Sequence, residues 1–156
     1  MCGTGVISTA KFINYTVYPD NHVRDKVIKK AANMSKKAIV VDNDFFFVEF
    51  LSELLQARGY QVIRTYDGKE AKSKLEQQSF DLIFVDMVMP KMDGRELIRF
   101  VRSTFPDVHF PIIALSGIIV EQLDKLDEMG ADYFITKGPM EKMAKYIEML
   151  MDKIEE

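Results

Sequence analysis

The stretch DLIFVDMVMPKMDGRE, from Asp81 to Glu96, decides the fold of this chain. It begins with a mostly apolar run, the run ends on the carboxylate of Asp86, and a turn containing Pro90 and Gly94 follows at once. A short apolar run bounded by turn residues is typical of a strand buried on both faces of a parallel sheet. Because a strand that only filled a core would have no use for a charged end, we interpret this strand as one that presents Asp86 to a ligand.

Similar apolar runs recur along the chain and alternate with helical patterns. The predicted strands cover residues 38–41, 61–65, 81–85, 111–115 and 132–136. The predicted helices cover residues 44–58, 68–78, 94–104, 119–129 and 140–154. This alternation predicts the α/β class, with a doubly wound, five-stranded parallel sheet and helices on both of its faces.

Composition limits the class of protein. With 156 residues, 47% of them hydrophobic and 29% charged, the chain has the balance of one ordinary globular domain. Its net charge of −3 gives no general attraction to nucleic acid, and no DNA-binding domain is expected. No apolar run is long enough to span a bilayer, the N-terminus lacks a signal-peptide pattern, and Cys2 is the only cysteine. These features predict a cytoplasmic protein without a membrane anchor.

The first 35 residues differ in kind from the rest. An apolar but irregular piece, GVISTAKFINYTVY, precedes a helix predicted to open at Asp20, whose apolar side is formed by Val23, Val27, Ile28 and Ala31. We divide the chain into an N-terminal extension, residues 1–35, and a domain, residues 36–156. Two interpretations of the extension stay open, because either the natural start is Met34 or the extension adds a helix to the domain.

The carboxyl ends of the predicted strands carry the polar residues that decide function, because ligands of such folds bind there. Three carboxylates, Asp42, Asp44 and Asp86, are expected at this edge. Like charges held close together are costly unless a cation neutralises them, and ligands that are all oxygen suit Mg²⁺. A backbone carbonyl near Met87 or Val88 is expected to complete the site. Asp44 has an alternative role as the N-cap of the helix that follows.

A lysine and a serine stand at neighbouring strand ends. Lys137 follows the fifth predicted strand, and Ser116 follows the fourth. A phosphoryl group on a carboxylate spreads its charge over oxygens that a metal ion, an ammonium and a hydroxyl together satisfy. Asp86 is then the expected nucleophile, and it needs no base because it is already ionised.

Four stretches, in this order, resemble the receiver domains of two-component response regulators. They are IVVDND from residue 39, VDMVMPKMDG from residue 85, PIIALSG from residue 111 and GADYFITKGP from residue 130. The resemblance covers about residues 36–156. It implies a flavodoxin-like sheet in the strand order 2-1-3-4-5.

The resemblance also implies a role for each matching residue. Asp86 corresponds to the phosphoacceptor, and Lys137 corresponds to the lysine that assists it. Mg²⁺ is the implied cofactor, held by Asp42, Asn43, Asp86 and the backbone carbonyl of Val88. Ser116 and Phe134 correspond to the switch hydroxyl and the switch aromatic residue.

The implied activity is phosphoacceptance from a histidine kinase or a histidine phosphotransfer protein. The chain is expected to be mainly not an enzyme, with slow autodephosphorylation at most. Because the last predicted helix ends the chain, we expect a stand-alone receiver without an output domain. Its output is then another protein or a homodimer formed through the face of the fourth helix, fifth strand and fifth helix.

The chain departs from the family pattern at four positions. Asn43 stands where a second acid is common, which is expected to weaken metal binding. Gly138 separates Lys137 from Pro139, which puts the geometry of that loop in doubt. Val88 and Ile118 are apolar, and neither side chain can orient an attacking water, so we predict a phosphoryl group that lasts hours rather than seconds.

The first predicted helix of the domain carries more apolar residues than one face can bury. Its predicted core stripe consists of Phe47, Phe50, Leu51, Leu54 and Leu55. That assignment leaves three apolar residues for the rim beside the expected site: Phe45, Phe46 and Val48. They are interpreted either as a contact surface for the phosphoryl donor or as a surface covered by the N-terminal extension.

Two other functions compete with the phosphoacceptor. A degenerate receiver that acts only as a protein-interaction scaffold is favoured by Asn43 and Gly138. A Mg²⁺-dependent phosphohydrolase also uses an Asp nucleophile, but such enzymes usually carry a second Asp two residues later, where this chain has Val88.

Overall fold

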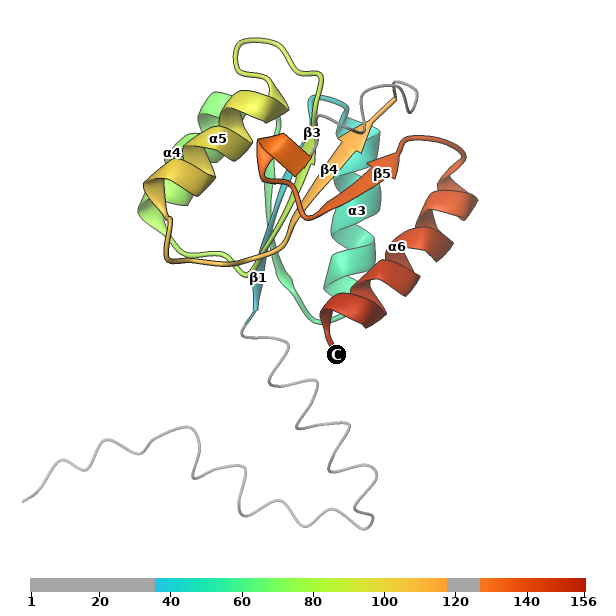
Figure 1. The fold of residues 1–156 in the computed structure, drawn as a ribbon. Coiled ribbons are helices and arrows are strands. Elements are labelled where there is room, and N and C mark those ends of the chain that lie inside the picture. The colour runs from blue at the N-terminus through green and yellow to red at the C-terminus, as the bar shows by residue number, and fades with distance from the viewer. Residues whose placement is uncertain (1–35, 118–126) are drawn as a thin grey trace, which may run out of the picture.

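A computed structural model describes residues 36–117 and 127–156, and these residues form one parallel sheet with helices on both faces (Figure 1). The sheet has the order β2-β1-β3-β4-β5. Its strands are β1 (Lys37–Val41), β2 (Gln61–Thr65), β3 (Leu82–Asp86), β4 (Ile112–Ser116) and β5 (Tyr133–Thr136). The predicted fold class and strand order are therefore confirmed.

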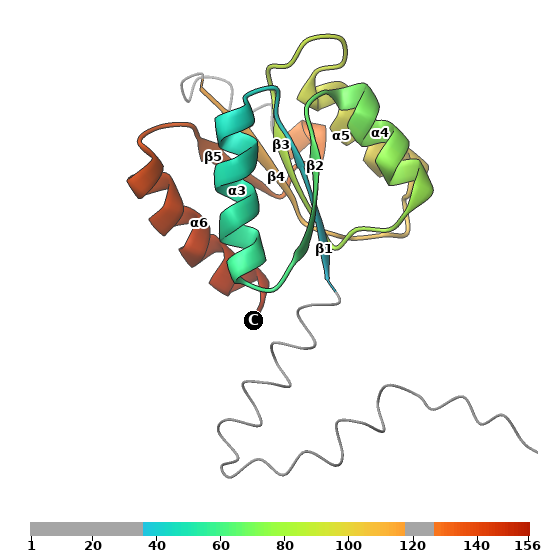
Figure 2. The ribbon, with the colours of Figure 1, turned by 180° about the vertical axis from the view of Figure 1, so that it is seen from behind.

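Within the described residues, four helices and one short 3-10 turn accompany the sheet. They are α3 (Phe45–Ala57), α4 (Gly68–Gln77), α5 (Gly94–Thr104), η2 (Asp127–Met129) and α6 (Met140–Ile154). Helices α4 and α5 cover one face of the sheet, and α3 and α6 cover the other (Figures 1 and 2). Each face has its own apolar core, because successive residues of a strand point to opposite sides. No helix in the described part of the chain combines the length and apolar character needed to cross a bilayer.

Strand boundaries differ from the prediction by one residue where the difference matters for the site. Asp86 and Ser116 are the last residues of β3 and β4, although both were expected just after their strands. Both backbones are thereby held in the sheet ladder rather than in a loop. Of the helix predicted over 119–129, only the last three residues are described, and they form η2. Ile118 and the helix predicted to open at Asp20 lie outside the described residues.

Three of the described helices begin at an aspartate N-cap, whereas α6 begins after Pro139 without a side-chain cap. The side chains of Asp44, Asp67 and Asp93 accept hydrogen bonds from the backbone N–H groups of Phe46, Glu70 and Glu96, respectively. The chain leaves α3 through Gly59, whose φ of 91° lies in the left-handed region that favours glycine. The N-cap interpretation of Asp44 is thus confirmed.

The predicted core stripe of α3 was wrong in one respect. Val48 is fully buried, although it was expected on the rim. Its neighbours at helical spacing, Leu51, Ser52 and Leu55, are fully buried as well. These positions follow the i, i+3, i+4, i+7 pattern, with Ser52 donating its hydroxyl hydrogen to the carbonyl oxygen of Val48. A small polar residue inside the stripe had hidden its true phase.

Candidate functional site

The strand register brings three charged residues to one edge of the sheet. Val41 of β1 pairs with Val85 of β3, so Asp42 and Asp86 are neighbours at the carboxyl ends of adjacent strands. By strand alternation, both carboxylates belong to the face covered by α3 and α6. Lys137 follows β5 on the same face, and its backbone N–H donates to the carbonyl oxygen of Ser116 over 2.7 Å.

Lys137 forms ion pairs with both carboxylates. Its Nζ lies 2.6 Å from Oδ2 of Asp42 and 3.3 Å from Oδ2 of Asp86. Asp42 is fully buried, and Asp86 is 5% exposed. Two buried negative charges therefore share one ammonium, which leaves the cluster with a net charge of about −1 in a region of low dielectric.

The surroundings of Asp86 disfavour its ionised form. Burial raises the pKa of Asp86 above its ordinary value, and the neighbouring Asp42 carboxylate raises it further. Lys137 and the backbone N–H of Val88 act in the opposite direction but do not cancel these effects. The site is thus short of positive charge.

A tight loop closes the site beyond β3. The N–H of Gly94 donates to the carbonyl oxygen of Met87 over 3.2 Å, and the N–H of Val88 lies 3.4 Å from Oδ1 of Asp86. Lys91 turns the loop with a positive φ of 70°. Val88 is 59% exposed, two residues after Asp86. The loop therefore directs a backbone donor at the carboxylate and leaves an apolar residue exposed to solvent.

Ser116 and Phe134 belong to the opposite face of the sheet. Ser116 is 6% exposed at the end of β4, in register with Thr136 of β5. Phe134 pairs in register with Ala114 and packs, partly buried, against the core under α4 and α5. Five of the predicted site residues thus fall into a charged group on one face (Asp42, Asp86 and Lys137) and a pair on the other face (Ser116 and Phe134), while Asn43 and Val88 are exposed in the loops that follow β1 and β3.

The carboxylate oxygens of Asp42 and Asp86 fit the requirements of Mg²⁺. Asp42 Oδ2 is buried and accepts no hydrogen bond among the described residues, so its contact with Lys137 is an ion pair without hydrogen-bond geometry. Within residues 36–117 and 127–156, no group of three or more His, Cys, Asp or Glu side chains is placed to share a metal ion. Two buried carboxylates that lack positive charge fit a cation that keeps several waters, as Mg²⁺ does.

The two residues that follow Asp42 are exposed, unlike Asp42 itself. Asn43 is exposed immediately after Asp42. Asp44 is exposed as well, and its carboxylate is engaged in capping α3. The backbone N–H of Asp44 donates to Oδ1 of Asp42 over 2.9 Å, which helps to orient the buried carboxylate.

Sequence reasoning missed one contact of the site. The Nζ of Lys137 lies 4.4 Å from the centre of the Phe47 ring, a cation–π arrangement. Phe47 had been assigned only to the core stripe of α3. Its place in the first turn of α3, five residues after Asp42, was the available signal. The ring therefore packs against the same ammonium that pairs with the two carboxylates.

Substitution of Asp86 by Asn is expected to stabilise the metal-free protein. Lys137 keeps Asp42 as a partner, while the repulsion and the burial of one charge are removed. We expect the free energy of unfolding at pH 7 with a chelator present to rise by about 1 kcal/mol. Because the pKa of Asp86 is raised in the folded state, the contribution of Asp86 to the stability of the wild type falls as the pH rises from 4 toward neutrality.

The gain should therefore be small near pH 4 and largest near pH 7. Urea unfolding at both pH values measures it, and Asp44→Asn, which retains a capping side chain, is the control expected to change little. A gain that is equal at both pH values would contradict the electrostatic explanation.

Comparison with known proteins points to a single family. A family model described as the response regulator receiver domain matches residues 38–148. The chain is 40% identical over 106 residues to the alkaline phosphatase synthesis transcriptional regulatory protein PhoP of Bacillus subtilis, covering 67% of this chain and 43% of that protein. It is 34% identical over 116 residues to the regulatory protein VanRc of Enterococcus gallinarum, covering 72% and 48%, respectively. The chain thus spans less than half the length of these curated relatives.

A solved structure agrees with these sequence matches. The response regulator protein TrrA of Thermotoga maritima, crystallised in complex with Mg²⁺ and BeF, is 28% identical. The TM-score is 0.62, over 74% of this chain and 98% of that one.

Proposed function

The chain belongs to the response regulator receiver family of two-component signalling, and from this membership we propose that Asp86 accepts a phosphoryl group. The observation that supports the proposal most directly is the buried cluster of Asp42, Asp86 and Lys137 at the carboxyl edge of the sheet. A core-filling role does not account for two buried carboxylates with one shared cation. The proposal assigns residues 36–156 to the receiver and residues 1–35 to an N-terminal extension.

The proposed step is a transfer from phosphohistidine. An oxygen of the Asp86 carboxylate attacks phosphorus, the O–P bond forms, and the P–N bond breaks with its electron pair returning to the imidazole. Lys137 is already within ion-pair distance of Asp86, so its ammonium is available to the charge that develops on the phosphoryl oxygens. The Val88 N–H, aimed at Asp86 Oδ1, holds the nucleophile in place.

Asp42 and Asp86 are the residues that would hold Mg²⁺, with Asn43 and the carbonyl of Val88 as further candidate oxygen ligands. When bound, Mg²⁺ supplies positive charge that screens the two carboxylates from each other and from an incoming phosphoryl group. The buried Oδ2 of Asp42, which accepts no hydrogen bond among the described residues and has only its ion pair with Lys137, supports this assignment.

The phosphoryl donor is proposed to be a histidine kinase or a histidine phosphotransfer protein in the cytoplasm. An aromatic cluster beside the site offers a docking surface for it. Phe45 is 59% exposed and Phe46 is 74% exposed. Phe45 stacks on Tyr66 with ring centres 6.2 Å apart. Exposed aromatic residues of this kind are typical anchors of protein contacts.

The signal is proposed to leave through β5 and α6, either to a partner protein or to a second copy of the chain. Ser116 and Phe134 are the proposed switch pair. Methionines on α6 divide into two groups, since Met143 and Met151 are buried whereas Met140 and Met149 are 45% and 70% exposed. Exposed Met side chains adapt readily to a partner surface.

One experiment separates this function from its rivals. The full chain is incubated with acetyl phosphate and Mg²⁺, and its intact mass is followed with time. A single adduct of one phosphoryl group is expected. Turnover of acetyl phosphate or another small ester without a lasting adduct would support a phosphohydrolase, and the absence of any reaction would support a scaffold.

Substitution of Val88 by Asn is expected to shorten the life of the adduct. The exposed valine cannot orient an attacking water, whereas an amide can. We expect the rate of phosphoryl loss to rise by about tenfold, below the full effect of a positioned general base. Loss of the adduct mass after removal of acetyl phosphate measures this rate. Val108→Asn, which alters another exposed valine, is the matched control, and an equal acceleration there would refute the shielding role of Val88.

A further inference from the structure

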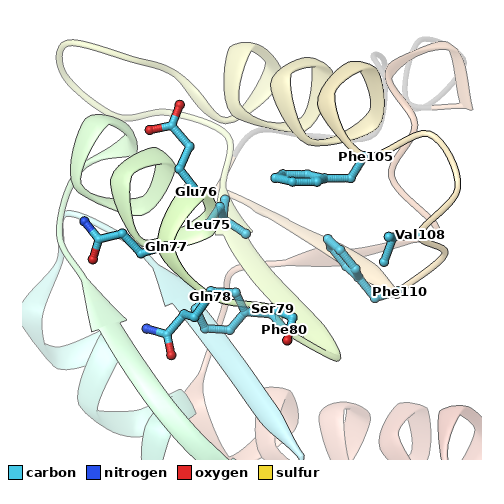
Figure 3. Close-up of a pocket in the computed structure, with 9 residues that line it drawn as sticks. All are labelled: Leu75, Glu76, Gln77, Gln78, Ser79, Phe80, Phe105, Val108 and Phe110. Carbon is cyan, nitrogen blue, oxygen red and sulfur yellow. The ribbon is translucent and has the colours of Figure 1, made fainter.

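A hollow lies at the amino edge of the sheet, away from Asp86. Its buried floor is formed by Leu75, Phe80 and Phe110, and its outer wall by Phe105 and Val108 (Figure 3). The hollow has a volume of about 240 Å³. This is smaller than the sites that hold drug-sized ligands, and it suits one or two apolar side chains of a peptide.

The hollow opens beside the place where the described chain begins. Lys37, the first residue of β1, donates from Nζ to Oε1 of Gln78 on the rim over 3.1 Å. Its backbone N–H also donates to Oδ2 of Asp81 over 2.8 Å. The chain that precedes Lys36 is therefore tethered next to this hollow, whereas the aromatic cluster of Phe45 lies beyond the far end of β1.

The preceding 35 residues contain a segment of matching chemistry. Residues 5–18, GVISTAKFINYTVY, include eight apolar or aromatic residues among fourteen. Residues 1–35 carry five basic and two acidic side chains, a net charge of +3. Since the whole chain has a net charge of −3, residues 36–156 carry −6. The two parts attract each other, and Glu76 places a carboxylate at the hollow itself.

The chain between residues 5–18 and β1 is long enough to reach the hollow and short enough to keep the segment concentrated near it. The residues between Tyr18 and Lys36 can span at most about 60 Å when extended, far more than the distance to the rim requires. A short tether holds its end at an effective concentration of about millimolar. A contact with a dissociation constant at or below about a millimolar is therefore populated within one chain, although it would not form between separate molecules at micromolar concentration.

We propose that residues 5–18 dock in this hollow of the same chain, with an aromatic side chain from Phe12, Tyr15 or Tyr18 as the anchor. The ring fills the space between Leu75 and Phe105, and the basic residues that follow the segment lie along the acidic domain. The site is distinct from the phosphoacceptor edge, and docking leaves Phe45 and Phe46 free for a donor.

A paramagnetic label tests the placement on the full chain. Cys2, the single cysteine, is moved by the double substitution Cys2→Ser/Thr9→Cys, and a nitroxide is attached at position 9. Methyl signals of Leu75 and Val108 are expected to lose most of their intensity. Those of Val88, at the opposite edge, are expected to keep theirs. Dilution with unlabelled, isotope-free chain should not restore the lost signals, because the contact is intramolecular.

Two sets of variants identify the anchor and its receptor. Val108→Arg adds bulk and positive charge at a side chain that is 48% exposed, so the fold should tolerate it, and the Leu75 signals should recover. Replacement of Phe12, Tyr15 and Tyr18 by Ser should restore the same signals. Asn14→Ser/Thr16→Ser, in the same segment, is the matched control, and the Leu75 methyl signals should stay weakened in this variant.

Three results would overturn the proposal. Loss of the Val88 signals would place the segment at the phosphoacceptor edge. Recovery on dilution would assign the hollow to a second copy of the chain. Unchanged Leu75 and Val108 signals would mean that the segment does not dock there at all.

Discussion

Substitution of Asp86 by Asn is expected to abolish the phosphoryl adduct. The amide is close in size to the carboxylate but is not a nucleophile toward phosphorus at neutral pH, and no second carboxylate is equivalent. Asp42 is fully buried at the end of another strand, and Asp44 is turned toward the backbone of Phe46 as a cap. Intact mass after incubation with acetyl phosphate and Mg²⁺ should therefore show unmodified protein only. The yield of the adduct is expected to fall at least about a hundredfold relative to the wild type.

The control is Asp44→Asn, which also replaces a carboxylate near the site by an amide. It should retain the adduct, since Asn caps a helix as well as Asp does. The variant Asp86→Asn should be as folded as the wild type, and in metal-free buffer more stable. An adduct on Asp86→Asn of the same mass and yield as on the wild type would assign the phosphoryl group to another residue.

Substitution of Gly94 by Ala is expected to cause the largest loss of stability. A Cβ at this position would collide with the backbone carbonyl oxygen of Asp86 and lie 2.8 Å from the Cα of Met87. Both atoms belong to the backbone at the end of β3, so no side-chain rotation relieves the contact. We expect the free energy of unfolding to fall by about 3 kcal/mol, the upper range for overpacking. Urea unfolding measures the loss.

The matched control is Gly138→Ala, because a Cβ at Gly138 would meet no atom within 4 Å. Its stability should stay within about 0.5 kcal/mol of the wild type. The surviving folded fraction of Gly94→Ala is also expected to accept the phosphoryl group more slowly, since the strained backbone carries Asp86. Equal stability of the two variants would show that the loop relaxes around the added methyl group.

The sheet was predictable because each strand is signalled locally. An apolar run of four or five residues between turn signals appears five times, and all five runs form strands within one residue of the expected bounds. The order of the strands came instead from the family resemblance, since spacing alone does not specify which strand pairs with which. Caps at Asp44, Asp67 and Asp93 were equally local, because a side-chain oxygen meets a backbone N–H two or three residues away.

The burial of residues on α3 was predicted less well, because it depends on which side of the helix faces the core. Three consecutive aromatic residues open α3, and the predicted buried stripe began at the last of them, Phe47, and left Val48 on the rim. The structure buries Val48 with Leu51, Ser52 and Leu55, at the spacing i, i+3, i+4, i+7, and it leaves Phe45 and Phe46 exposed, as expected. The sequence carries this stripe, but Ser52 interrupts its apolar character, and burial of the Ser52 hydroxyl depends on its hydrogen bond to the carbonyl oxygen of Val48.

The candidate site also divides into features that the sequence predicts and features that required the folded structure. The residue types and the strand ends that carry Asp42, Asp86 and Lys137 can be read along the chain, because parallel strands deliver their last residues to one edge. The distances of 2.6 Å and 3.3 Å, the burial that raises the pKa of Asp86, and the Phe47 ring against Lys137 all required the folded molecule. The local sequence pattern assigns each residue to a strand, a cap or a turn. The interaction between the charges of Asp42, Asp86 and Lys137 depends instead on residues far apart in the chain, which meet only when the strands assemble into the sheet.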